Sequence, residues 1–104
     1  MHTVIVVDDH PAIRLAVRPA LEARGGFQVV GEAGDGPTAL AAIRDQRPDL
    51  VILDLDLPRL SGLDLIERVR KSQPGTKLLV LSAQQESIFA ARTGQAGANG
   101  LMSR

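Results

Sequence analysis

The stretch PDLVILDLDLPRLSG, residues 48–62, decides the fold. Its run Leu50–Leu53 is continuously apolar, which suits a strand of a parallel sheet that is covered on both faces. Two aspartates, Asp54 and Asp56, follow at once. The same order, a short apolar run that ends in acidic or hydroxyl residues, recurs in TVIVVDD, residues 3–9, and in KLLVLS, residues 77–82. The recurrence predicts three buried parallel strands with polar residues at their carboxyl ends.

Strand and helix patterns alternate outward from this stretch along the whole chain of 104 residues. The expected strands are Thr3–Val7, Gln28–Glu32, Leu50–Leu53, Lys77–Leu81 and Gly100–Ser103. The expected helices are Pro11–Arg24, Pro37–Gln46, Gly62–Ser72 and Glu86–Ala96. This alternation predicts an α/β fold, a doubly wound five-stranded parallel sheet with helices on both faces. For this sheet we expect the flavodoxin-like strand order 2-1-3-4-5, one of the two common orders of doubly wound sheets.

The length fits a single domain. Because a fold of this kind usually closes with one more helix after the last strand, we expect residues 1–104 to form a domain that is truncated at its C-terminal end. In the first helix, apolar residues recur at helical spacing from Ile13, through Ala16 or Val17, to Ala20 or Leu21, so this face is expected to point toward the sheet.

Composition excludes several classes of function. The chain has 12 basic and 12 acidic residues, so its zero net charge gives no electrostatic basis for binding nucleic acid or an anionic membrane. No apolar run approaches the length that spans a bilayer. The absence of cysteine excludes disulfides and thiolate metal sites, and it fits a cytoplasmic protein.

Candidate site residues stand where the apolar strands end. Asp8 and Asp9 follow the first strand, Asp54 and Asp56 follow the third, and Ser82 follows the fourth. In open α/β sheets, ligands bind at the carboxyl ends of the strands. Because the predicted order makes the first, third and fourth strands neighbours, we expect Asp8, Asp9, Asp54 and Ser82 to converge on one pocket.

Three carboxylates that lie together repel each other, and a hard divalent cation such as Mg²⁺ relieves that repulsion. A carboxylate beside such an ion can attack phosphorus, so Asp54 is the candidate nucleophile and Ser82 a candidate contact for the phosphoryl group. A structural alternative stays open, in which Asp8 and Asp9 cap the first helix and Asp56 shapes a turn before Pro58. His10 flanks the site, and we interpret it as a solvent-facing residue at the start of the first helix rather than as a metal ligand.

These residues resemble the receiver domain of bacterial response regulators over the whole chain. The matching stretches are VIVVDDHPAIRLAVR at residues 4–18, PDLVILDLDLPRLSGLDLIERVR at 48–70, LLVLSA at 78–83 and AGANGLMSR at 96–104. Pro58 and Gly62 stand at the family's usual spacing after the phosphorylated aspartate. The opening VDDHP and the run IRLAVR are most similar to the subgroup with LuxR-type (NarL/FixJ-like) helix-turn-helix outputs.

The resemblance implies a role for each site residue. Asp54 is then the phosphoacceptor, Asp9 binds Mg²⁺ directly, Asp8 binds it through water, and the main-chain carbonyl of Asp56 is a further ligand. Ser82 contacts the phosphoryl group. Ala83 leaves room above the site, and Asp56 and Gln84 tune the lifetime of the phosphate.

The resemblance also implies the partners. A sensor histidine kinase donates the phosphoryl group, the protein can form a homodimer, and DNA is bound only through an output domain that is absent from these residues.

Two positions depart from the family pattern. Arg104 stands where the family has a lysine, and a forked, planar guanidinium does not fill the same space as a compact ammonium group. Leu101 stands where the family usually has tyrosine or phenylalanine. It therefore lacks the aromatic ring that, in the family, couples the site to the face formed by the last strand and its two neighbouring helices.

Two alternatives to the phosphorylated receiver follow from these residues. The departures at Arg104 and Leu101 would suit a pseudo-receiver, a protein-binding module that is not phosphorylated. The pair Asp54 and Asp56 also resembles the DxD motif of haloacid-dehalogenase-like phosphatases, but that motif lies near the N-terminus in its own family and leaves Asp8 and Asp9 unexplained.

Overall fold

The computed structural model describes residues 1–82, 94–95 and 97–103. The strands are β1 His2–Val7, β2 Phe27–Ala33, β3 Leu50–Asp54, β4 Lys77–Ser82 and β5 Gly100–Ser103. The helices are α1 Pro11–Arg24, α2 Gly36–Gln46 and α3 Gly62–Ser72. Every expected element that falls on described residues is present, with ends that differ by no more than one residue. The expected helix Glu86–Ala96 lies outside the described residues except at positions 94 and 95.

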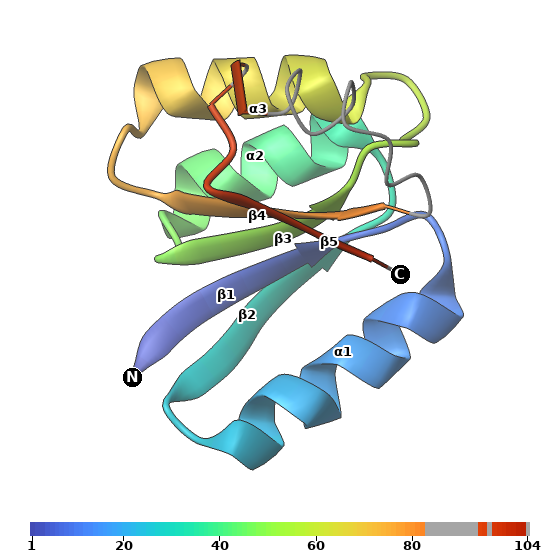
Figure 1. The fold of residues 1–104 in the computed structure, drawn as a ribbon, viewed down its shortest axis with the longest axis vertical. Helices are drawn as coiled ribbons and strands as arrows, with labels where there is room; N and C mark the ends of the chain where they lie inside the picture. The colour runs from blue at the N-terminus through green and yellow to red at the C-terminus, as the bar shows by residue number, and fades with distance from the viewer. Residues whose placement is uncertain (83–93, 96, 104) are drawn as a thin grey trace.

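The five strands form one sheet in the order β2-β1-β3-β4-β5. Every neighbouring pair is parallel, as Figure 1 shows. The predicted flavodoxin-like strand order is therefore confirmed. Because all strands run the same way, their carboxyl ends share one edge of the sheet, and β1, β3 and β4 are consecutive there.

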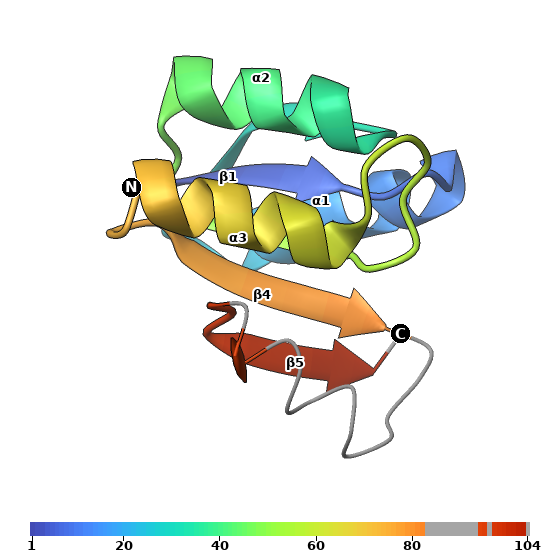
Figure 2. The ribbon, with the colours of Figure 1, turned by 90° about the horizontal axis from the view of Figure 1, so that it is seen from above.

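Helices α2 and α3 cover one face of the sheet, and α1 lies on the other (Figures 1 and 2). The larger hydrophobic cluster fills the α2–α3 side. Its largest fully buried members come from the sheet and from both helices: Ile5, Ile43, Val51, Leu53, Leu65, Ile66, Val69, Leu78 and Val80. This side is the closed core of the domain, since apolar side chains meet there from both layers.

The α1 side of the sheet is packed less completely. Its buried cluster consists of Val4, Val6, Val29 and Ile52, while Val17, Leu21, Phe27 and Leu79 are only partly buried beside it. No residue of α1 itself is buried. The apolar face expected for this helix does point toward the sheet, but among the described residues an apolar groove stays open between α1 and β4.

Local sequence signals fix where α2 and α3 begin. The Asp35 side chain accepts a hydrogen bond from the Thr38 amide at 2.8 Å, and the Ser61 hydroxyl accepts one from the Asp64 amide at 3.2 Å. Each bond satisfies an amide that has no partner within its helix. No helix among the described residues is long and apolar enough to cross a membrane.

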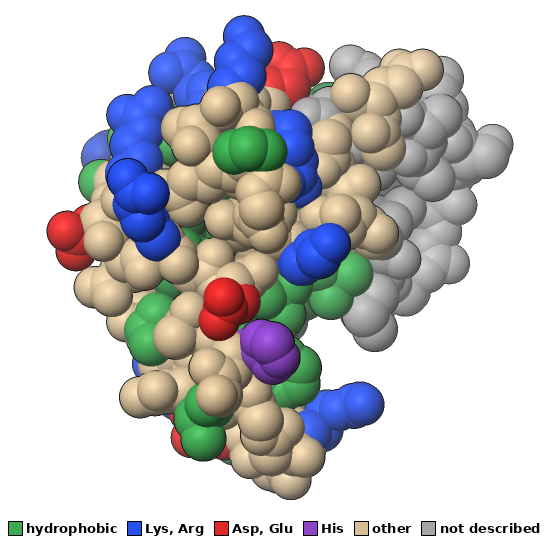
Figure 3. All heavy atoms as spheres, turned by 90° about the vertical axis from the view of Figure 1, so that its left-hand side faces the viewer, with side chains coloured by type: hydrophobic (Ala, Val, Ile, Leu, Met, Phe, Trp, Pro, Cys, Tyr) green, Lys and Arg blue, Asp and Glu red, His purple; other side chains and the backbone are tan. Residues whose placement is uncertain are grey.

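The edge where the strands begin carries a different kind of surface. Figure 3 views the molecule from this side, and lysine and arginine side chains gather over its upper half, where α2 and α3 lie. Cations near the carboxyl ends of helices interact favourably with the helix dipole. The acidic residues at the strand ends lie at the opposite edge of the sheet.

Candidate functional site

A buried carboxylate lies just after the end of β1. Asp8 follows the strand directly, is only 1% exposed, and its amide donates to the Ala33 carbonyl of β2 at 3.0 Å. The Asp8 Oδ1 atom accepts a hydrogen bond from the His10 amide at 2.9 Å. The next residue, Asp9, is exposed. The first half of the acidic pair is thus held by backbone bonds, while the second half faces solvent.

Arg14 of α1 stabilises this turn. Its guanidinium donates to the main-chain carbonyl of Asp8, and its Nε atom lies 3.4 Å from the Glu32 carboxylate of β2. Arg18, one turn further along, reaches the same Glu32 carboxylate at 2.8 Å. No sequence pattern assigns Arg14 a role, because none shows that a side chain of the first helix turns back onto the end of β1.

The second buried carboxylate lies at the end of β3. Asp54 is the last residue of the strand, is 2% exposed, and its Oδ1 atom accepts a hydrogen bond from the Asp56 amide at 3.3 Å. The loop then closes where Gly62 donates to the Leu55 carbonyl at 2.9 Å. A Cβ atom at Gly62 would lie 2.5 Å from Leu55 Cα, so only glycine permits this close approach.

The same loop is docked on the start of α2. The Gly36 amide donates to the Pro58 carbonyl at 3.2 Å. A Cβ atom at Gly36 would lie 2.3 Å from Leu60 Cβ, so the loop is in close contact with the helix backbone. The segment after Asp54 is therefore anchored at both ends.

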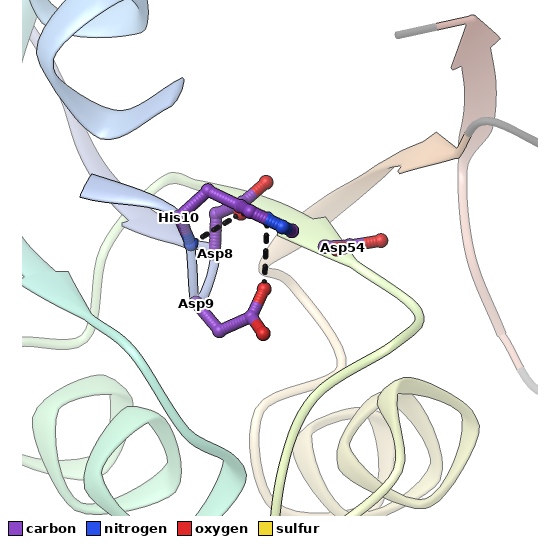
Figure 4. A group of neighbouring side chains, drawn as sticks. All are labelled: Asp8, Asp9, His10 and Asp54. Carbon is purple, nitrogen blue, oxygen red and sulfur yellow. Dashed lines mark hydrogen bonds and ion pairs between the residues drawn. The ribbon is translucent and has the colours of Figure 1, made fainter. Parts of the chain in front are cut away.

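Three predicted residues and one further residue converge at the carboxyl edge of the sheet. Among the described residues, ligand atoms of Asp8, Asp9, His10 and Asp54 all lie within 4.8 Å of one another (Figure 4). Asp56 does not belong to this group, and its side chain is exposed. The structure thus brings together the aspartates of β1 and β3 and leaves the Asp56 carboxylate outside. A DxD phosphatase would need that carboxylate at the reaction centre.

His10 does more than begin α1. It is the N-cap residue of that helix, but its side chain makes no capping hydrogen bond. Its Nδ1 atom instead lies 2.9 Å from Asp8 Oδ1 and 2.9 Å from Asp9 Oδ1. The interpretation of His10 as a solvent-facing residue is therefore incomplete, because the half-exposed ring also contacts both members of the acidic pair. The N-cap position belongs to His10, so neither aspartate occupies it.

The structure describes the backbone of Ser82 but not Arg104. Ser82 ends β4, and its strand neighbour Leu81 pairs with Asp54 of β3, so the backbone of Ser82 stands at the site's edge of the sheet. The side chain of Ser82 and the whole of Arg104 lie outside the described residues, as do Ala83 and Gln84. Leu101 is placed in β5 by its backbone alone.

The comparisons with known proteins agree on one family. The sequence model of the response regulator receiver domain matches residues 4–104. A Pseudomonas aeruginosa protein named as a transcriptional regulator is 50% identical over 104 residues, which are 100% of this chain and 50% of that protein. The transcription regulator BvgA of Bordetella pertussis is 40% identical over 99 residues, which are 95% of this chain and 47% of BvgA. The chain spans about half the length of these curated relatives.

The solved structures point the same way. A LuxR-family two-component response regulator from Aurantimonas sp. SI85-9A1 superimposes with a TM-score of 0.94 at 34% identity, and the match covers 99% of this chain and 74% of that one. The strand order, the acidic site at the strand ends and these matches lead to one conclusion: the chain belongs to the response regulator receiver domain family, in its LuxR-type subgroup.

Proposed function

We propose that Asp54 accepts a phosphoryl group in a Mg²⁺-dependent reaction, and that residues 1–104 are the receiver domain of a longer, cytoplasmic regulator. One observation carries the proposal. The nearly buried Asp54 carboxylate at the end of β3 lies with Asp8 and Asp9 in a group whose ligand atoms are within 4.8 Å of one another. A carboxylate held beside others in this way needs a compensating cation, and it can act as a nucleophile once it has one.

The donor set fits Mg²⁺. The carboxylates of Asp8, Asp9 and Asp54 supply oxygen atoms, which are the ligands that Mg²⁺ prefers, and the exposed side of Asp9 is open to the waters that this ion keeps. Asp9 and Asp54 would hold the ion directly, Asp8 through water, and the main-chain carbonyl of Asp56 would add a ligand. When bound, Mg²⁺ neutralises part of the negative charge on the carboxylates and on an approaching phosphate.

The chain's own residues perform the transfer. An Asp54 carboxylate oxygen forms a bond to phosphorus, and the bond from phosphorus to the donor breaks, with its electron pair leaving on the donor. The product is an acyl phosphate on Asp54. In this proposal the Ser82 hydroxyl donates a hydrogen bond to a phosphoryl oxygen, and Arg104 supplies positive charge beside the phosphate.

The partners follow from the family. The donor would be the phosphohistidine of a sensor histidine kinase. The relatives are about twice as long as this chain, and two of them are named as transcription regulators. We therefore infer a helix-turn-helix output domain that contacts DNA, and a homodimer formed on phosphorylation. The receiver itself has zero net charge and would not bind DNA.

Intact mass spectrometry after incubation with acetyl phosphate tests the proposal. With Mg²⁺ present, the chain should gain the mass of one phosphoryl group, and the gain should disappear in Asp54→Asn and on addition of EDTA. Asp45→Asn is the matched control, because Asp45 is an exposed carboxylate on α2 and lies away from the site. It should be phosphorylated like the unaltered chain.

Two results would contradict the proposal. A folded sample that gains no phosphoryl group with Mg²⁺ would favour the pseudo-receiver. Steady turnover of a phosphate ester that is abolished by Asp56→Asn would favour a phosphatase.

A further inference from the structure

We propose that His10 is a metal-selectivity residue, and that its Nδ1 atom is a direct ligand for borderline divalent ions such as Ni²⁺ in the Asp8–Asp9 site. This inference rests on the proposed function, since it assumes that the acidic site binds a divalent cation. It goes further by assigning a nitrogen donor to a site otherwise made of oxygen donors.

The distances around His10 suit an ion with octahedral geometry. Nδ1 lies 2.9 Å from Asp8 Oδ1 and 2.9 Å from Asp9 Oδ1. Octahedral ions hold ligands at about 2.0–2.1 Å, so adjacent ligand atoms are separated by about 2.9 Å. The Nδ1 atom and Asp9 Oδ1, which we propose as direct ligands, are therefore spaced like neighbouring ligands of one ion. Figure 4 shows the ring directed toward Asp9 and Asp54 rather than away from the site.

The backbone around His10 fixes the point from which the ring extends. Pro11 restricts the residue before it to extended conformations, and His10 has φ −98° and ψ 110°. Its amide is fixed on Asp8 Oδ1 at 2.9 Å. The ring thus extends from a backbone position set by Pro11 and by the bond to Asp8, and the half-exposed ring leaves room for water to complete a coordination shell.

The chemistry of the donors predicts which ions gain from His10. Ionised carboxylate oxygens only accept hydrogen bonds, so in the metal-free arrangement Nδ1 carries the hydrogen that lies between them. An ion bound at Nδ1 takes the place of that hydrogen. Imidazole is a good ligand for Ni²⁺, Co²⁺ and Zn²⁺, whereas Mg²⁺ prefers oxygen. His10 should therefore strengthen binding of Ni²⁺ much more than binding of Mg²⁺.

Isothermal titration calorimetry with NiCl₂ and with MgCl₂ tests the inference. Loss of a supporting partner alone weakens a metal site about 10- to 100-fold, so His10→Ala should lower the Ni²⁺ affinity at least about tenfold and change the Mg²⁺ affinity by less than about twofold. His10→Phe should behave like His10→Ala, because a phenyl ring keeps the approximate size of the imidazole and offers no ligand atom. Circular dichroism of both variants checks that they are folded.

His2 supplies the matched control. It is the only other histidine of the chain and also lies beside an aspartate, with its Nδ1 atom 3.9 Å from Asp49 Oδ2, but it lies outside the acidic group. His2→Ala should leave both affinities unchanged. In proton NMR spectra, Ni²⁺ should broaden the imidazole resonances of His10 and spare those of His2.

The outcomes separate this inference from the proposed function. If Mg²⁺ binds and the Ni²⁺ affinity is unchanged in His10→Ala, the inference is wrong and the proposed function stands. If His10→Ala strengthens binding of both ions, His10 competes with the cation and is not its ligand, so the inference is again wrong. If the unaltered chain binds neither ion, both are wrong.

Discussion

At the scale of single residues, Asp49 joins the starts of two central strands. Its Oδ2 atom accepts hydrogen bonds from the Thr3 amide at 2.8 Å and from the Thr3 hydroxyl at 3.3 Å. The bond from the Thr3 amide, helped by the hydroxyl, by His2 and by the N-terminus, lowers the pKa of Asp49 below its usual 3.8. The charged carboxylate is thus favoured in the folded state.

This lowered pKa predicts a pH-dependent contribution to stability. The folded state binds the Asp49 proton less tightly than the unfolded state does, so the stabilisation is fully present above about pH 4 and is lost as the pH falls through the folded pKa. Asp49→Asn should therefore lower the unfolding midpoint in urea at pH 7, and the difference from the unaltered chain should shrink as the pH falls below about 4. A constant difference for Asp49→Asn at every pH would contradict this explanation.

The aspartates of the site could be predicted from sequence, whereas their supporting residues could not. Asp8, Asp9 and Asp54 follow buried strands, and a parallel sheet brings such ends together whatever the side-chain details. The contacts of His10 and Arg14 depend on where a side chain turns after the backbone is placed. No periodicity in the sequence encodes that direction.

At the scale of elements, one arginine of α3 connects the start of β4 with the approach to β5. The Arg70 guanidinium donates to the carbonyls of Pro74 at 2.6 Å, Thr76 at 2.8 Å and Gly97 at 2.7 Å. It also donates to Asn99 Oδ1 at 2.8 Å, and that oxygen accepts the Leu78 amide as well. Three segments of chain are held by one planar group.

Removal of this group should be costly for the chain's stability. Hydrogen bonds to charged groups are worth roughly 1.5–3 kcal/mol each, and partial exposure reduces that value, so Arg70→Ala should lower the free energy of unfolding by about 2–4 kcal/mol. Arg70→Lys should restore little of it, because an ammonium group cannot reproduce the fork. Arg68→Ala, on the exposed surface of α3, should cost less than about 0.5 kcal/mol. Urea unfolding measures all three, and equal costs at positions 68 and 70 would contradict the role of Arg70.

The ends of the elements were accessible from sequence because local signals set them. Gly25 has φ 78° just after α1, and the side chains of Asp35 and Ser61 cap α2 and α3. Each signal acts within a few residues of the element it ends or begins. The bonds of Arg70 reach residues 27 and 29 positions away, so they depend on the tertiary fold and no local pattern predicts them.

At the scale of the whole molecule, the two faces of the sheet are unequal, which the sequence did not reveal. The alternation of patterns and the handedness of the crossovers predict a doubly wound parallel sheet with helices on both faces, and 2-1-3-4-5 is one of the common strand orders that satisfy both. How deeply each face is buried depends on how much of it the helices cover. Apolar residues recur along α1 and α3 alike, yet only α3 buries any of its residues.

Adjacent leucines of β4 test this inequality directly. Leu78 points into the α2–α3 core and is 1% exposed, whereas Leu79 belongs to the α1 side, lines the groove there and is only partly buried. Removing a fully buried leucine side chain costs about 2–5 kcal/mol, from lost burial and from the cavity left behind. Leu78→Ala should fall in that range, and Leu79→Ala should cost about 1 kcal/mol, because water already reaches its side chain. Urea unfolding of both variants at the same protein concentration makes the comparison. Equal costs would mean that the groove is covered in solution, and a dependence of the Leu79→Ala cost on protein concentration would identify a second copy of the chain as its cover.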